Sequence, residues 1–168
     1  WEINYDGTPM ACDYRDDEHF WRNTAGMFDL VHGAYRQYRW TGNAALVHDP
    51  LLKSFYARTV NEFVAAHDRD GNGIVDARAA NGWGIACTYN EMPGIVLAES
   101  ADSLGTQYRA FDAHAKFLQA RGDRSGAEVW AAKAERLKRV FNDTWHDDKA
   151  GRYLIGFDLP GRKAVSTF

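Results

Sequence analysis

Carboxylate side chains crowd the segment from residue 13 to residue 18, directly before an aromatic-rich stretch. Four of these six residues are acidic, and Arg15 stands among them. The start of a helix would explain one or two carboxylates, because they cap the helix and favour its dipole. Close like charges raise the pKa of at least one carboxyl group, which suits a proton donor. Asp16, Asp17 and Glu18 are therefore candidate catalytic residues, and Arg15 is a candidate substrate contact.

A further candidate carboxylate, Glu91, lies in a segment that has neither helical nor strand periodicity. The segment runs from residue 77 to residue 99 and contains Gly82, Gly84, Pro93 and Gly94. Long ordered loops between scaffold elements commonly carry functional residues. We predict that Glu91 takes part in catalysis and that Trp83 and Tyr89 contact the substrate.

One aromatic and two polar residues, Trp21, Arg22 and Asn23, follow the acidic segment. Indole rings stack on the apolar faces of pyranose rings, while polar side chains bind the hydroxyl groups. These three residues predict a carbohydrate-binding surface beside the candidate acids.

The segment from residue 68 to residue 76 has the oxygen pattern of a calcium-binding loop. Oxygen-bearing side chains stand at its first, third, fifth and ninth positions, and these are Asp68, Asp70, Asn72 and Asp76. Ala79 occupies the twelfth position, where such loops have a bidentate glutamate. Asp-Gly and Asn-Gly pairs also form tight turns without metal. The sequence is compatible with a structural calcium and with a turn that holds no metal. We expect no cofactor to be required. We expect this loop at the end of its helical hairpin opposite the acidic helix start.

Apolar residues recur at helical spacing in four stretches, which we predict as long helices. Their predicted bounds are Phe20–Trp40, Pro50–Ala66, Ala101–Arg121 and Ser125–Asn142. Gly42 and Gly122 stop the first and third helices and lie 80 positions apart (122 − 42). This spacing indicates two antiparallel αα-hairpins of a larger array. Short strand pairs are expected only near Ile74 and Tyr153.

Two carboxylates, Glu99 and Asp102, flank Ser100 at the predicted start of the third helix. A serine followed by acidic side chains is typical of a helix N-terminus. We therefore interpret both carboxylates as capping residues.

Length and composition are those of a globular domain or of a part of one. The chain has 168 residues, 45% hydrophobic content and a net charge of −3 with acids and bases interspersed. The sequence has no basic stripe that would predict nucleic-acid binding, and no apolar run approaches the ~20 residues of a membrane span. Cys12 and Cys87 lack a metal or redox spacing and are expected to be free thiols.

The start at Trp1 and the end at Phe168 predict that residues 1–168 form a segment of a larger single catalytic domain. A secreted or periplasmic location is favoured, with a signal peptide preceding the segment.

The helices and turns resemble those of the six-hairpin glycosidase superfamily, which includes glucoamylase-like, trehalase-like and α-L-rhamnosidase-like enzymes. The resemblance spans roughly residues 15 to 157 and rests on four features. These are the helix that ends in Trp40-Thr41-Gly42-Asn43, the Asp70-Gly71-Asn72-Gly73-Ile74 turn, Ala120-Arg121-Gly122-Asp123 with the helix after it, and Gly151-Arg152-Tyr153. It implies an all-α fold, an (α/α)6 toroid of αα-hairpin repeats with short β-hairpins at the turns. It also implies two acidic residues in a central pocket. Arg15-Asp16-Asp17-Glu18 is similar to an Arg-Asp-Glu segment of α-L-rhamnosidases, and Trp21-Arg22-Asn23 is similar to a substrate-binding element of glucoamylase-like members.

The sequence thus predicts a glycoside hydrolase that acts on an oligo- or polysaccharide with paired carboxylates. One carboxyl group protonates the glycosidic oxygen, and the other activates water or attacks the anomeric carbon. A polysaccharide lyase on a similar toroid is one alternative. A non-catalytic helical module that binds a glycan or a protein is the other.

Overall fold

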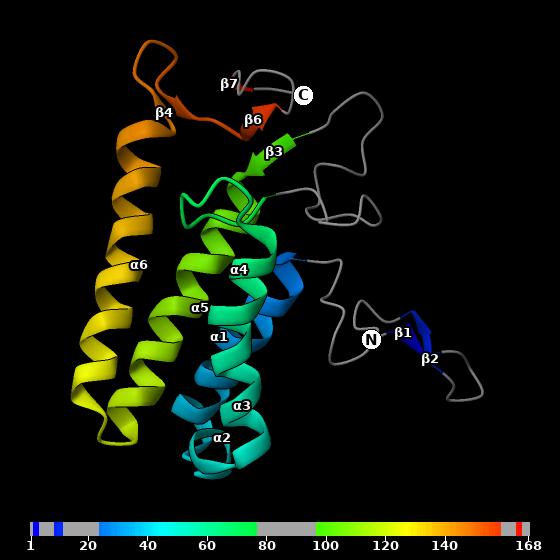
Figure 1. The fold of residues 1–168 in the computed structure, drawn as a ribbon, viewed down its shortest axis with the longest axis vertical. Helices are drawn as coiled ribbons and strands as arrows, with labels where there is room; N and C mark the ends of the chain where they lie inside the picture. Colours follow the sequence, from blue (N-terminus) through cyan, green and yellow to red (C-terminus); the bar gives the residue numbers. More distant parts are fainter. Residues whose placement is uncertain (1, 4–8, 12–23, 77–96, 159–163, 166–168) are drawn as a thin grey trace.

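The computed structural model describes residues 2–3, 9–11, 24–76, 97–158 and 164–165 of the chain. Most of these residues are helical, and a few short strands gather mainly at one end of the helices (Figure 1). The mostly helical class predicted from apolar periodicity is thereby confirmed. None of the described helices combines the length and the apolarity needed to cross a lipid bilayer.

The first helical hairpin begins with a long helix and returns through several consecutive helical segments. These are α1 (Thr24–Thr41), α2 (Ala45–His48), α3 (Pro50–Arg58), η1 (Thr59–Phe63) and α4 (Val64–His67). The left-handed Gly42, with φ of 66°, ends α1. Asp49 caps α3, because its carboxylate accepts hydrogen bonds from the amides of Leu51 and Leu52 at 2.8 and 3.1 Å. The predicted helix Pro50–Ala66 is therefore present, but it includes the π-helical segment η1, which was not predicted.

The second hairpin consists of α5 (Ala101–Ala120) and α6 (Arg124–Thr144), as the helical spacing predicted. Gly122, with φ of 87°, provides the left-handed turn between them. The Asp123 carboxylate then caps α6 by accepting from the Gly126 amide at 2.9 Å. The boundaries agree with the predicted helices to within a few residues.

Aromatic rings from α1, α3 and α5 meet in the common core of the two hairpins. The rings of Tyr56 and Phe117 stack with centroids 4.5 Å apart, and Tyr35 packs edge-on against Phe117 at 5.5 Å. Phe28 packs edge-on against Phe63 at 5.6 Å. Because these buried rings belong to both hairpins, the hairpins form one packed unit.

The described residues include seven short strands. They are β1 (Glu2–Ile3), β2 (Pro9–Ala11), β3 (Leu97–Ser100), β4 (His146–Asp147), β5 (Arg152–Tyr153), β6 (Gly156–Asp158) and β7 (Ala164–Val165). Strands β4 and β5 form the hairpin predicted near Tyr153. The strand predicted near Ile74 is wrong, because residues 70–76 form an irregular turn held by side-chain hydrogen bonds. A three-stranded antiparallel sheet in the order β3-β6-β7 was not predicted.

The turn after α4 lies at the same end of the bundle as the start of α1 (Figure 1). The sequence interpretation placed it at the opposite end, which is wrong. In an antiparallel hairpin the second helix runs back along the first, so its end lies beside the first helix's start. The start of α5 and strand β3 also lie at this end, which we call the turn end of the bundle.

Candidate functional site

Ten of the predicted site residues lie outside the described residues. They are the catalytic candidates Asp16, Asp17, Glu18 and Glu91 and the substrate-binding candidates Arg15, Trp21, Arg22, Asn23, Trp83 and Tyr89. Cys12 and Cys87 also lie outside. The four candidate calcium ligands are described, and they belong to the polar turn between α4 and residue 76.

The side chains of this turn bind backbone amides of the same turn. Asp68 Oδ2 accepts from the Gly73 amide at 2.8 Å, and Asn72 Oδ1 accepts from the Ile74 amide at 2.7 Å. Asp76 Oδ2 accepts from the amide of Arg69 at 2.9 Å, closing the turn at its base. Such local hydrogen bonds are how short polar side chains shape a turn without metal.

The described residues contain no group of three or more His, Cys, Asp or Glu side chains positioned to hold a metal ion. In the turn, Asp68 Oδ1 is buried without a hydrogen-bond partner, whereas Asp68 Oδ2 is occupied by a backbone amide. Calcium binding by Asp68, Asp70, Asn72 and Asp76 stays a prediction from the sequence.

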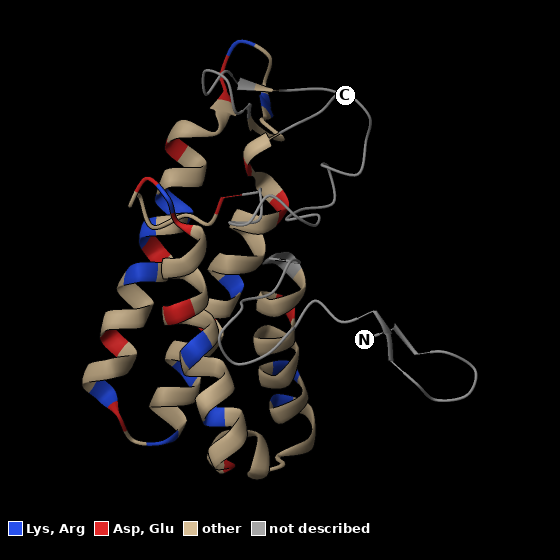
Figure 2. Ribbon diagram, turned by 45° about the vertical axis from the view of Figure 1, so that its right-hand side comes forward, with Lys and Arg blue, Asp and Glu red and all other residues tan. Residues whose placement is uncertain are grey.

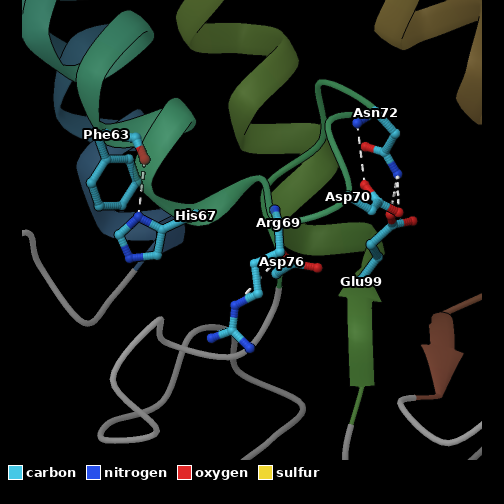
Figure 3. A network of polar contacts seen from close by, with 7 residues as sticks. All are labelled: Phe63, His67, Arg69, Asp70, Asn72, Asp76 and Glu99. Carbon is cyan, nitrogen blue, oxygen red and sulfur yellow. Dashed lines mark hydrogen bonds and ion pairs between the residues drawn. The ribbon is translucent and has the colours of Figure 1, made fainter.

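Glu99 is buried at the turn end, with 2% of its surface exposed, and it contacts the turn directly (Figure 3). Its Oε1 accepts a hydrogen bond of 2.6 Å from Asn72 Nδ2, which also lies 3.2 Å from Asp70 Oδ2. Burying a carboxylate costs several kcal/mol unless charge-assisted hydrogen bonds compensate. Asn72 therefore joins two carboxylates that are 29 residues apart in sequence (99 − 70).

The interpretation of Glu99 as a capping residue is wrong. Ser100 is the N-cap of α5 but makes no capping hydrogen bond through its side chain. Glu99 instead belongs to β3, all four residues of which are buried. An acidic residue at the end of an apolar run was the signal in the sequence that pointed to a buried carboxylate.

The side chain of Gln107 on α5 binds two backbone groups of the turn. Its Nε2 donates to the Gly73 carbonyl at 2.9 Å, and its Oε1 accepts from the buried Val75 amide at 3.1 Å. From α6, Arg136 Nη2 donates to the Asn72 carbonyl at 2.5 Å. Side chains from both helices of the second hairpin thus bind the turn, which keeps Asn72 in register with Glu99.

His67 and Asp76 complete the described polar cluster at the turn end. His67 is buried, and its Nδ1 lies 2.9 Å from the Phe63 carbonyl, so this nitrogen carries a proton and donates (Figure 3). Burial raises the pKa of Asp76, while the Arg69 amide and guanidinium act in the opposite direction. The cluster therefore combines a carboxyl group that retains its proton more readily than usual with the buried carboxylate of Glu99.

Comparisons of the chain with known protein families, with curated proteins and with solved structures found no match. The resemblance to six-hairpin glycosidases therefore rests on the residues quoted above.

Proposed function

We propose that the chain is part of a glycoside hydrolase in which paired carboxylates at the turn end of the bundle cleave a glycosidic bond. The observation that carries the proposal is the buried Glu99, which Asn72 holds at the end where α1 and α5 begin. A carboxylate is rarely buried unless its environment serves a structural or chemical purpose.

The catalytic candidates are attached to this same end by short lengths of chain. Glu18 precedes the first residue of α1 by six positions, and Glu91 precedes the first residue of β3 by six positions. Six residues span at most about 20 Å when fully extended. The turn end is therefore within reach of both candidates in the proposed enzyme, whose two carboxyl groups must converge.

The charge distribution supports an uncharged substrate. Basic and acidic residues are interspersed along the described helices (Figure 2). A mixed surface of this kind does not select a polyanion by its overall field. Specificity in the proposed enzyme then comes from stacking and hydrogen bonding by Trp21, Arg22, Asn23, Trp83 and Tyr89.

The first prediction tests the acids directly. Release of reducing sugar from a panel of oligosaccharides is measured for the wild type and for Asp17→Asn, Glu18→Gln, Glu91→Gln and Glu99→Gln. Loss of a general acid or base lowers the rate by about 10²- to 10⁴-fold, and we expect at least two variants to show this loss. Asp112→Asn is the control, because Asp112 lies on α5 in an ion pair with Lys116 away from the turn end.

Full activity in all four variants would remove the site assignment. A wild type that cleaves none of the oligosaccharides would overturn the proposed reaction.

A second candidate function, binding of a glycan or a protein without catalysis, is favoured by one exposed side chain. Trp40 is 82% exposed at the end of α1 far from the turn end, and the Arg36 guanidinium lies 5.7 Å from the centroid of its ring. Exposed tryptophan beside arginine is typical of binding hot spots, and indole rings also stack on sugars.

The second prediction separates this function from hydrolysis. If Trp40 binds a partner, Trp40→Ala lowers affinity for that glycan or protein at least tenfold and leaves reducing-sugar release unchanged. Affinity is measured by a glycan array and by surface plasmon resonance on the best ligand. The similarly exposed Leu51→Ala on α3 is the matched control. Equal binding by the Trp40→Ala variant would exclude this surface.

A further inference from the structure

A half-open cavity of about 320 Å³ lies between the two hairpins on the outer face of the bundle. Its floor is apolar and consists of four buried side chains, Val60, Val64, Phe111 and Leu137. They come from η1, α4, α5 and α6, so the cavity exists only where both hairpins pack together. Its volume falls within the range of small-molecule sites.

The rim of the cavity carries two cations and no acid. Lys133 and Arg136 line it from one side of α6, and Asn61 of η1 also lines it. Among the described residues, neither cation has a carboxylate within ion-pair distance. No acidic side chain is found among the described residues that line this cavity. These residues therefore place two positive charges beside an apolar floor.

Both cations are held in place by neighbouring groups. Lys133 Nζ lies 3.9 Å from the centroid of the Trp130 ring, and Arg136 Nη2 is bonded to the Asn72 carbonyl at the turn. A guanidinium has five N–H donors, so the bond to Asn72 leaves others for a ligand. Side chains that are already ordered lose less entropy when a ligand binds.

The π-helical segment η1 supplies Val60 and Asn61 to the cavity. A π-helical turn inserts one residue into a helix at an energetic cost, and such turns are frequent at functional sites. Here the π-helical turn places one apolar and one amide side chain at the same opening. This observation is independent of the charge at the rim.

We propose that this cavity binds an amphiphilic organic anion, a small carboxylate whose apolar body has about the size of a naphthalene ring. The carboxylate forms charge-assisted hydrogen bonds with Arg136 and Lys133, which are stronger than bonds between neutral groups. The apolar body covers Val60, Val64, Phe111 and Leu137 and removes their remaining surface from water. The cavity adjoins the polar turn, because Gly73 lines it and Arg136 binds the Asn72 carbonyl, while Glu99 contacts the Asn72 side chain.

The test is calorimetric titration of the full chain with 2-naphthoate at low ionic strength. For a ligand of this size we expect a Kd between about 10 μM and about 1 mM. Lys133→Met and Arg136→Met each weaken binding by about tenfold or more. Lys138→Met is the matched control, because Lys138 lies on the same helix, pairs with Glu135 and does not line the cavity.

The neutral analogue 2-naphthamide tests the role of charge, because it keeps the ring and loses the carboxylate. We expect it to bind at least tenfold more weakly, and we expect about 0.3 M salt to weaken only 2-naphthoate. Asn61→Asp adds a negative charge to the rim and should weaken 2-naphthoate while leaving 2-naphthamide unchanged.

Arg136→Met also removes a hydrogen bond of the turn, whereas Lys133→Met leaves the turn intact and so isolates the charge. The thermal unfolding midpoint of each variant is recorded, and if Arg136→Met is unfolded at the titration temperature, Arg136→Gln replaces it, because glutamine removes the charge and keeps an N–H donor. Unchanged 2-naphthoate binding in Lys133→Met, equal binding of 2-naphthamide, or no heat at millimolar 2-naphthoate would each overturn the proposal.

Discussion

His114 has a buried imidazole ring, and protonation of this ring disfavours the folded state. It lies on α5 with its ring edge-on to Trp130, at 5.1 Å between centroids. Burial, together with the positive charges of Arg121 and Lys133, lowers its pKa from 6.5 to about 4. The folded protein therefore keeps this ring neutral at a pH at which the unfolded chain protonates it.

The resulting prediction concerns stability between pH 7 and pH 4. The unfolded state binds more protons in this window, so the free energy of unfolding falls as the pH drops from about 6.5 towards about 4. The contribution of this one group is roughly 3 kcal/mol at most. His114→Gln removes it, so the wild type should lose stability more steeply than the variant in urea unfolding across this range. His146→Gln is the control, because His146 is paired with Asp148 on the surface. Parallel pH profiles for the wild type and His114→Gln would contradict this account.

Glu99 illustrates which residues elude prediction from sequence. Its acidic type and its position beside Ser100 fit a helix start, whereas its burial arises from β3, β6 and the turn that carries Asn72. Asn72 lies 27 residues away in sequence (99 − 72), and no local pattern indicates that pairing. Local rules therefore identified the turn's own hydrogen bonds, but only the tertiary structure brings the second carboxylate to them.

At the scale of elements, two glycines offer a pair of substitutions with opposite expected signs. Gly122 has φ of 87° between α5 and α6, a conformation that costs an L-residue about 1–2 kcal/mol. Gly105 lies inside α5, and apart from its chain neighbours and the backbone of its own helix, no atom of the described residues lies within 4 Å of the position that a Cβ would occupy. Gly122→Ala should therefore destabilise the fold by about 1–2 kcal/mol, and Gly105→Ala should stabilise it by about 0.5–1 kcal/mol. The measurement is the urea midpoint of each variant, and shifts of the same sign would contradict it.

The helices were predictable because their determinants are local. Apolar residues at helical spacing, the left-handed glycines and the Asp123 cap all lie within or beside the elements that they define. The sheet of β3, β6 and β7 was not, because its strands have two to four residues each and β3 pairs with β6 across more than 50 positions. The π-helical segment was also missed, since no sequence rule separates a π-turn from an α-helix at Thr59–Phe63.

At the scale of the whole molecule, the two hairpins are joined at both ends as well as through their core. At the turn end, Gln107 of α5 binds the turn of the first hairpin. At the far end, Arg121 Nε donates to the Val47 carbonyl at 2.7 Å, linking the turn of the second hairpin to α2. These links lie on either side of the stacked Tyr56 and Phe117 rings, so neither hairpin can separate without losing polar and apolar contacts together.

The last prediction follows from the position of Gln107 between the hairpins. Gln107→Leu removes the partners of the Gly73 carbonyl and the Val75 amide, and Val75 is fully buried. Each unpaired backbone group costs about 1–3 kcal/mol, so we expect the free energy of unfolding to fall by about 2–5 kcal/mol. Gln119→Leu, at an exposed position of the same helix, should change it by less than about 0.5 kcal/mol. Because the hairpins share one core, far-ultraviolet circular dichroism and tryptophan fluorescence should report one coincident urea transition in both variants. Equal stability of the two variants, or separate transitions in the wild type, would show that the hairpins are not joined in this way.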